Sequence, residues 1–442
     1  MTQASLVNRR TFVKGMLAAG ATVTVAACAP VAAPSGPAPA APVAPPTVTG
    51  PSWIHPKSLV RAAPGYGGAH LTWKYGDTVK WLPPEKYQAD AAADALAKLP
   101  KEKLTDIYSK MLRSRTYDNT MRDLYVGGKE GLLPGYYGTS GQEAASVGFT
   151  AALNPDDYVA TTHRPNLDFI AKGGSIREMA AEVYLKATGV SSGRSDPMHT
   201  VDNKLGFTSS GIVGAGFYMA AGAAWSAKVR KSGQVAVFFA GDASCNSRSA
   251  FTTIRSAANY KLPLLIAIQN NFQGVSNPAA VTTPTPYVAD YFTGLGLPTV
   301  VVDGNNIAQV YAAAKEAVDR ARAGEGPSVT ELMTWRWYDH SGWGGAKAGV
   351  DAAWGLPYRT DDEVRAWMAR DPIGRMGTFL VERGLFTQGE LDALKAKAKA
   401  EMDEAVVFAR LSPEPRPEDG VKFAYTAWVP PATQFFEHPV VT

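Results

Sequence analysis

Cysteine is nearly absent from this chain, which has only Cys28 and Cys245 among its 442 residues. So few cysteines exclude a disulfide-rich scaffold, and we expect no disulfide. The chain also has no large excess of either charge, because its net charge is only +4 at pH 7, and lysine and arginine form no block. This balance excludes the basic patches of nucleic-acid-binding proteins, and no DNA- or RNA-binding motif or internal repeat occurs.

Apolar residues, by contrast, are plentiful. They make up 45% of the chain, and charged residues make up 19%. A chain of this length and composition can bury a sizeable core, as one large domain or two ordinary ones.

The N-terminus reads as a targeting segment over residues 1–28. Residues 8–14, Asn-Arg-Arg-Thr-Phe-Val-Lys, match the twin-arginine export pattern. The apolar run of residues 16–27 is too short for an ordinary transmembrane helix. It leads into Val-Ala-Ala-Cys28, which resembles a bacterial lipobox, although cleavage after Ala29 also fits the sequence. We expect export to the periplasm, where a lipid on Cys28 would be the only contact with the membrane.

Composition divides the rest of the chain. Residues 29–50 are rich in proline and alanine, which predicts an extended linker. Residues 51–100 read as an irregular extension that packs onto the main domain and has no recognisable chemistry. The main domain is expected over 101–415, and a tail rich in proline and aromatic residues over 416–442.

One segment of the main domain predicts a strand, a helix and a second strand. Apolar runs at 234–240 and 262–268 flank a helical pattern at 248–261. Such a unit forms two parallel strands joined by a right-handed crossover. Asp242 and Asn271 follow the two strands, so both should lie at the carboxyl edge of the sheet, where open α/β sheets bind ligands.

A carboxylate and an amide side by side suit a hard cation such as magnesium, which can in turn hold phosphate oxygens. A plain structural unit with a turn aspartate and a turn asparagine fits the spacing equally well. The pattern alone leaves both interpretations open.

Alternating strand and helix patterns continue through the domain. They predict a doubly wound parallel sheet in the α/β class. Further strands are expected at 158–160, 300–302 and 328–333, and helices at 101–127, 215–227, 307–323, 361–370 and 387–411.

At Asp242 and Asn271 the chain resembles a known family. Gly241-Asp242-Ala243, followed about thirty residues later by Asn270-Asn271, is similar to the thiamine diphosphate motif. The surrounding sequence resembles the alpha subunit of the first component of 2-oxo acid dehydrogenase complexes, and acetoin dehydrogenase alpha subunits are similar too. The likeness runs from about Leu104 to about Pro415. Its landmarks are Gly141-Gln-Glu-Ala144, Thr162-His-Arg164, Ile170-Ala-Lys-Gly173, Met198-His199, Gly211-Ile-Val-Gly-Ala215, Lys261-Leu-Pro263 and His340-Ser341.

The resemblance implies a metal site and a thiamine diphosphate site. Asp242 and Asn271 would bind Mg²⁺ by their side chains, and Gln273 by its backbone carbonyl. Ala243 and Ser244, in the same motif, would contact the cofactor.

The resemblance assigns the other cofactor contacts to more distant loops. Arg164, with His163 beside it, would hold the diphosphate, and the backbone of Gly211 and Val213 would hold the aminopyrimidine ring. His340 would be the catalytic histidine of the active-site loop. His199 is expected to be structural.

The chain departs from the family pattern mainly at positions expected on the substrate side. Tyr137, Asn166 and Tyr338 stand where the family has histidines. Ala243 replaces the third motif glycine, and a glycine-rich stretch has become Gly-Arg-Ser-Asp-Pro over 193–197. Cofactor anchoring is therefore expected to be retained better than substrate-side proton chemistry.

No glutamate of this chain is assignable to activation of the aminopyrimidine. The resemblance implies that a beta-type subunit supplies it within an α₂β₂ heterotetramer. The expected activity is oxidative decarboxylation of a 2-oxo acid or cleavage of acetoin. The alternative is an exported, non-catalytic lipoprotein that binds the cofactor.

Overall fold

The computed structural model describes residues 61–62, 69–70, 89–126, 136–341, 359 and 361–422. The predicted signal segment, the proline-rich linker and residues 423–442 of the predicted tail lie outside these residues. Within them, no helix has both the length and the apolar character needed to cross a bilayer.

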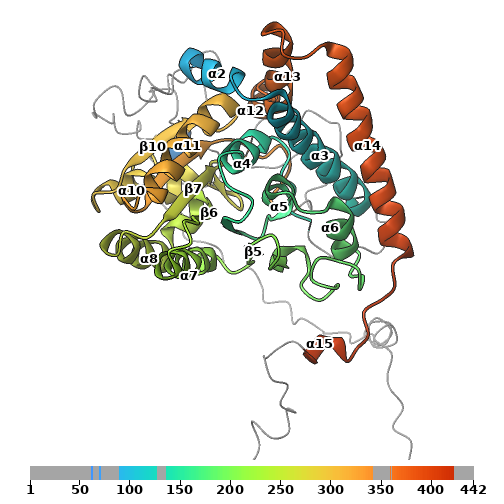
Figure 1. Cartoon of the computed structure of the whole chain (residues 1–442), viewed down its shortest axis with the longest axis horizontal. Helices are drawn as coiled ribbons and strands as arrows, with labels where there is room; N and C mark the ends of the chain where they lie inside the picture. The colour runs from blue at the N-terminus through green and yellow to red at the C-terminus, as the bar shows by residue number, and fades with distance from the viewer. Residues whose placement is uncertain are drawn as a thin grey trace, which may run out of the picture. The chain divides into compact units, whose positions relative to one another are not determined.

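A seven-stranded sheet forms the centre of the domain (Figure 1). The strand order is β10–β11–β7–β6–β3–β5–β4, and every neighbouring pair is parallel except β4 with β5. The predicted α/β class with a mostly parallel sheet is therefore confirmed. The bounds are β3 (Tyr158–Thr161), β4 (Val201–Asp202), β5 (Phe207–Ser209), β6 (Ala236–Gly241), β7 (Leu264–Asn270), β10 (Thr299–Asp303) and β11 (Ser328–Met333).

Helices flank the sheet. The longer ones are α2 (Ala89–Ala97), α3 (Lys101–Val126), α4 (Glu143–Thr150), α6 (Ile176–Val183), α7 (Ala215–Arg230), α8 (Arg248–Asn259), α11 (Ile307–Arg322), α12 (Asp361–Met368), α13 (Pro372–Glu382) and α14 (Gln388–Leu411). Shorter ones are α5 (Asn166–Lys172), α9 (Ala279–Thr282), α10 (Asp290–Thr293) and α15 (Asp419–Lys422). Short strand pairs are β1 (Arg61–Ala62) with β2 (Ala69–His70) and β8 (Gln273–Gly274) with β9 (Asn277–Pro278).

The structure corrects one part of the sequence prediction. Residues 51–100 were expected to be irregular, but α2 is a regular helix within that range. Its alanine-rich sequence has high intrinsic helix propensity, and Ala92 and Leu96 are buried in the core that also contains α3 and α13. Helix α2 therefore belongs to the packed domain.

Alternate residues of the central strands face two separate cores, as pleating requires. Val237 and Phe239 of β6 face a core that contains residues of α4, α5, α6, α11 and α14. Phe238 and Ala240 face a core that contains residues of α7, α8 and α10. Because both faces are covered, β6 and β7 read as unbroken apolar runs in the sequence.

The contact between α7 and β6 depends on a glycine. A Cβ atom on Gly216 would overlap the ring of Phe238, which is fully buried. Gly222, on the same helix, has no neighbouring atom where its Cβ would lie.

These two glycines give a matched test of the packing. Gly216→Ala should lower the free energy of unfolding by about 1–3 kcal/mol, because the added methyl overpacks the core. Gly222→Ala should raise it by up to about 1 kcal/mol, because alanine favours a helix interior. Chemical denaturation measures both. Equal effects of the two substitutions would contradict close packing of α7 on β6.

Candidate functional site

The carboxyl ends of the parallel strands meet at one edge of the sheet, and the segments that follow them line one cavity of about 420 Å³. Residues after β3, β5, β6, β7 and β11 all contribute. Strand register explains the meeting, since Gly241 at the end of β6 pairs with Gln269 near the end of β7. All ten residues predicted for the site line this cavity: His163, Arg164, Gly211, Val213, Asp242, Ala243, Ser244, Asn271, Gln273 and His340.

Asp242 and Asn271 present oxygen atoms without donors. Asp242 is buried, and its Oδ2 accepts no hydrogen bond from the described residues. Asn271 donates through Nδ2 to Gln142 Oε1 at 3.1 Å, while its Oδ1 has no described donor. Buried acceptors without donors are costly unless something else satisfies them. A bound cation would satisfy both, so these residues fit a metal site.

This donor set differs from the usual protein metal cluster. Among the described residues, no group of three or more His, Cys, Asp and Glu side chains is arranged to hold a metal ion. A cation at Asp242 would have one carboxylate and would depend on amide, backbone and ligand oxygens. Mg²⁺ is bound in this manner, through one or two carboxylates and substrate phosphates.

Burial makes Asp242 harder to ionise. It raises the pKa of Asp242 to about 6, and the guanidinium of Arg336 opposes the rise. A cation bound at this carboxylate would lower the pKa again, since it favours the charged form.

Two buried guanidinium groups lie beside these oxygens. Arg164 donates to the backbone oxygen atoms of Gly138 and, at 3.1 Å, His340. Arg336 donates to Gln273 Oε1 at 3.2 Å and to the backbone oxygen of Val275. Neither arginine forms an ion pair with a carboxylate of the described residues. A buried charge without a partner is unfavourable, so the cavity is suited to an anion.

The sequence interpretation did not include Arg336, although it lies in the segment that carries His340. It occupies the middle of Trp335-Arg336-Trp337, and two flanking tryptophans usually indicate a buried segment. The signal was therefore present, because a buried arginine needs an acceptor.

Burial and the two arginines keep both nearby histidines neutral. Burial, together with the nearby groups Arg164, His340 and Arg336, lowers the pKa of His163 to about 2. Burial, Arg164 and Arg336 lower the pKa of His340 to about 3. The pKa of Arg164 itself falls to about 9, because it is buried near Arg336. At neutral pH the histidines are thus uncharged and can each donate one hydrogen bond and accept another.

Tyr137 joins the two histidines in an aromatic group. Its ring centroid lies 4.7 Å from that of His163 and 5.3 Å from that of His340, in edge-on contacts. The two imidazoles are 5.0 Å apart, and Nε2 of His163 has no described partner.

Of the three positions where the family has histidines, only Tyr137 lines the cavity. Asn166 is buried elsewhere and donates to the hydroxyl of Tyr136 at 3.1 Å. Tyr338 donates to Asn119 Oδ1 at 2.9 Å, and the guanidinium of Arg122 stacks on its ring. One of the three replaced positions therefore faces the cavity, and the other two are bonded elsewhere.

The cavity has an apolar edge at the start of α7. Gly214 has a φ of +84°, and a Cβ atom there would overlap Oγ of Ser249. This left-handed turn sets Ile212 and Val213 at the edge of the cavity, 70% and 68% exposed. Two large apolar side chains are thus open to solvent beside the site.

The methyl group of Ala243 is accommodated by a second glycine. A Cβ atom on Gly274 would lie 2.7 Å from that of Ala243, which is closer than carbon atoms can approach. Gly274 therefore provides the room that the additional methyl needs. The change from glycine to alanine in the motif leaves the cavity open.

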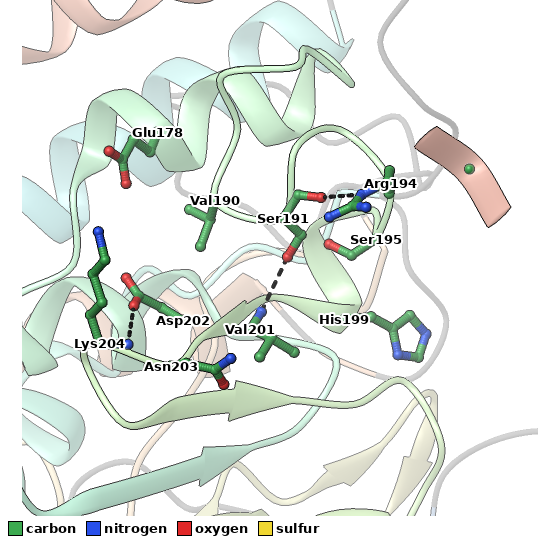
Figure 2. Close-up of a pocket in the computed structure, with 11 residues that line it drawn as sticks. Glu178, Val190, Ser191, Arg194, Ser195, His199, Val201, Asp202, Asn203 and Lys204 are labelled. Carbon is green, nitrogen blue, oxygen red and sulfur yellow. Dashed lines mark hydrogen bonds between the residues drawn. The ribbon is translucent and has the colours of Figure 1, made fainter. Parts of the chain in front are cut away.

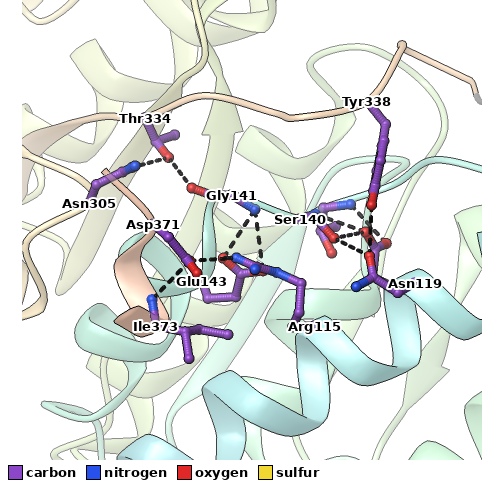
Figure 3. A network of polar contacts seen from close by, with 12 residues as sticks. Arg115, Asn119, Ser140, Gly141, Glu143, Asn305, Thr334, Tyr338, Asp371 and Ile373 are labelled. Carbon is purple, nitrogen blue, oxygen red and sulfur yellow. Dashed lines mark hydrogen bonds and ion pairs between the residues drawn. The ribbon is translucent and has the colours of Figure 1, made fainter. Parts of the chain in front are cut away.

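A polar network behind the cavity fixes the segment that carries His340 (Figure 3). Thr334 donates to the backbone oxygen of Gly141 at 3.3 Å and to Asn305 Oδ1 at 2.8 Å. Arg115 donates to both carboxylate oxygens of Glu143, at 2.6 and 2.9 Å. Helix α3 and the loop after residue 138 thereby hold the strand end in place.

A second pocket of about 770 Å³ lies beside the first, between α6 and β4 (Figure 2). His199 lines it, and its Nδ1 accepts a hydrogen bond from the backbone of Gly211 at 3.4 Å. His199 does not line the cavity that holds Asp242. Its predicted structural role agrees with this contact.

Known proteins resemble this chain over most of its length. The dehydrogenase E1 component family matches residues 108–418. The alpha subunit of acetoin:2,6-dichlorophenolindophenol oxidoreductase from Bacillus subtilis (strain 168) is 33% identical, over 75% of this chain and 96% of that protein. The subunit of the same name from Cupriavidus necator is 34% identical, over 77% and 99%.

A plant protein is equally similar. The chloroplastic pyruvate dehydrogenase E1 component subunit alpha-3 of Arabidopsis thaliana is 33% identical, over 72% of this chain and 73% of that protein. The match to this family spans the seven-stranded sheet, the cavity and both buried arginines. The chain therefore belongs to the dehydrogenase E1 component family, as a thiamine-diphosphate-dependent oxidoreductase of the alpha-subunit type.

Proposed function

We propose that this chain is the alpha subunit of an α₂β₂ enzyme that oxidatively decarboxylates a pyruvate-like 2-oxo acid or cleaves acetoin. It would bind thiamine diphosphate through Mg²⁺. The observation that carries the proposal is the cavity itself. In it, oxygens of Asp242 and Asn271 that have no donor among the described residues lie beside two buried arginines that have no carboxylate partner among them. The names of the acetoin and pyruvate enzymes among its relatives supply the substrate class.

Each charged group of the cavity has a task in this proposal. Asp242, Asn271 and the backbone carbonyl of Gln273 would hold the cation, and the cation would bridge to diphosphate oxygens. Arg164 and Arg336 would bind the remaining diphosphate charge, for which guanidinium geometry is well suited. Once bound, thiamine diphosphate supplies the electron sink for cleavage of the bond beside the carbonyl.

The histidines would act after the anion is bound. Burial, and then the charges of Arg164 and Arg336, lower the pKa of both His163 and His340. A bound diphosphate would offset the effect of the arginines and so favour the charged form of both imidazoles. His340, in edge-on contact with Tyr137, would be placed to hold or move a proton.

The need for a partner follows from the cavity lining. Asp242 is the only carboxylate among its described residues, and in this proposal it would bind the cation. A second chain would supply the activating glutamate. The three relatives described above are all named as alpha subunits, which supports this arrangement.

An apolar surface beside the cavity is suited to that partner. Ile212 and Val213 continue into exposed Tyr218 and Trp225 of α7 and Tyr260 beyond α8. Trp225 and Tyr260 pack edge to face with centroids 4.9 Å apart, beside a groove of about 340 Å³ between the helices. Exposed aromatic residues of this kind are enriched at protein interfaces.

Export is the remaining part of the proposal. Residues 8–14 and Cys28 support twin-arginine export and attachment to the membrane by a lipid, with the enzyme on the periplasmic side. From what is known of this route, it carries folded proteins, so thiamine diphosphate and Mg²⁺ would be loaded before export.

Cofactor binding should depend on Asp242. Asp242→Ala removes the charged ligand, so the affinity for thiamine diphosphate in the presence of Mg²⁺ should fall at least tenfold, or about 1.4 kcal/mol. Calorimetry measures it, with Asp202→Ala in the neighbouring pocket as control. Chelation of Mg²⁺ should weaken the wild type to a similar degree. Unchanged affinity in Asp242→Ala would refute the metal site.

Activity should require a second polypeptide. The chain alone, with cofactor and Mg²⁺, should turn over neither pyruvate nor acetoin, because no glutamate lines the described cavity. Copurified with a beta-type partner it should reduce a soluble dye more readily than it transfers acyl groups to a lipoyl domain. Turnover by the isolated chain would contradict the partner requirement. Tight cofactor binding without turnover by any pairing would favour the non-catalytic lipoprotein.

Export should depend on the two arginines near the N-terminus. Changing Arg9 and Arg10 to lysine should leave the precursor in the cytoplasm, as cell fractionation would show. Mass spectrometry of the mature protein should find lipid on Cys28. An unmodified N-terminus following Ala29 would instead indicate a periplasmic protein without an anchor.

A further inference from the structure

Glu331 is a buried carboxylate that neither lines the cavity nor forms an ion pair with a described residue. It lies in the middle of β11 and is fully buried. One oxygen accepts from Asn270 Nδ2 at 2.6 Å, and the other accepts from the backbone N–H of Ala289 at 2.8 Å. A buried carboxylate is costly to retain, so its contacts indicate what it stabilises.

Through Asn270, the first contact reaches the turn that carries the proposed metal ligands. Asn270 Oδ1 accepts from the backbone N–H of Phe272 at 2.9 Å, and the backbone oxygen of Asn270 accepts from Thr334 at 2.8 Å. The bond from Asn270 to Glu331 fixes the amide orientation, because the nitrogen must face the carboxylate. Its oxygen then faces the turn.

The turn itself is strained. Phe272 has a φ of +64°, a left-handed conformation that costs non-glycine residues about 1–3 kcal/mol. Its ring packs against Trp335 and Trp367, with centroids 6.2 and 6.0 Å away. Because Phe272 points into this apolar cluster, its neighbours Asn271 and Gln273 face the cavity.

The second contact of Glu331 lies at the far end of the same segment. Ala289 closes the stretch that begins at Asn271 and lines much of the cavity. Arg336 holds the middle of that stretch through Gln273 and Val275, and Val275 is also left-handed with a φ of +61°. One carboxylate thus ties both ends of the ligand-bearing segment to the sheet.

We propose that Glu331 is a positioning residue for cofactor binding: through Asn270 and Ala289 it holds residues 271–289 in the conformation that presents Asn271 and Gln273 to the cation. The inference rests on the proposed magnesium and thiamine diphosphate site. Glu331 touches neither group. Its loss should therefore weaken binding and leave the chemical step intact once cofactor saturates the site.

Asp157 provides a matched control. It is also a fully buried carboxylate, and it accepts from the backbone N–H groups of Val235 and Asn154 at 2.8 and 2.7 Å. Unlike Glu331, it also forms an ion pair with Arg322. It lies before β3, at the edge of the sheet opposite the cavity. Replacing Asp157 therefore disturbs at least as many contacts as replacing Glu331, without touching the ligand segment.

The experiment compares Glu331→Gln with Asp157→Asn in the full chain copurified with its partner. Glu331→Gln keeps the size of the side chain, but it replaces one of the two accepting oxygens by an N–H₂ group. That group then faces an N–H donor and cannot accept from it. The concentration of thiamine diphosphate needed for half-saturation at fixed Mg²⁺ should rise tenfold or more, while kcat at saturation stays within twofold. Asp157→Asn should leave both quantities within twofold, even where it lowers the melting temperature.

Hydrogen exchange without cofactor gives a second readout that needs no activity. Backbone amides of residues 271–277 should exchange at least tenfold faster in Glu331→Gln than in Asp157→Asn. If Glu331→Gln does not fold, Asn270→Ala tests the same chain of contacts with Glu331 still bonded to Ala289.

Two results would overturn the positioning role of Glu331. One is unchanged hydrogen exchange and unchanged half-saturation in a folded Glu331→Gln. The other is failure of both Glu331→Gln and Asn270→Ala to fold under conditions where Asp157→Asn folds. A wild type that binds no thiamine diphosphate would refute the proposed function instead. Faster exchange confined to the ligand segment would then still show that Glu331 orders it.

Discussion

The parallel hydrogen-bond register of β6, β7 and β11 is the constraint on which the site depends. Gly241 pairs with Gln269, and Asn270 pairs with Met333, so the three strands end at nearly the same level. The next residues of each strand leave the sheet at one edge. A slip of one residue in any pair would turn the side chains of that strand to the other face. The position of Asp242 beside Asn271 is thus a consequence of backbone pairing.

Electrostatic imbalance gives that edge its chemistry. Arg164 and Arg336 are buried without carboxylate partners among the described residues, and together with burial they keep both histidines of the cavity neutral. In the same cavity, Asp242 and Asn271 each hold an oxygen that has no donor among the described residues. The positive groups are suited to an anion and the oxygens to a cation, and the proposed magnesium diphosphate would satisfy both. The fold is stable around this imbalance because extensive apolar cores cover both faces of the sheet.

The departures from the family pattern differ in consequence. Ala243 is accommodated because Gly274 leaves room for its methyl. Tyr338 and Asn166 are bonded away from the cavity, to Asn119 and Tyr136. Tyr137 alone faces the site, in contact with both histidines. Of the three replaced histidine positions, only that of Tyr137 therefore lines the cavity.

The sequence by itself determined the α/β class and the residues that line the cavity. Local patterns sufficed for that, since apolar runs such as 262–268 mark buried strands and the residues just after them mark the functional edge. It also indicated α7, α8, α11 and α14 through helical patterns. It missed α2, which follows a segment with many glycine and proline residues. It missed short α4 and α5, because both are buried on every side.

Only the tertiary structure decided which of the candidate positions face one another. Arg336 lines the cavity because β11 pairs with β7. Glu331 has its proposed role because Asn270 and Ala289, both far from it in the sequence, donate hydrogen bonds to it. Tyr338 lies outside the cavity, where its hydroxyl donates a hydrogen bond to Asn119 of α3. Such pairings depend on long-range contacts, and a single sequence records residue types and spacing but not which distant segments pack together.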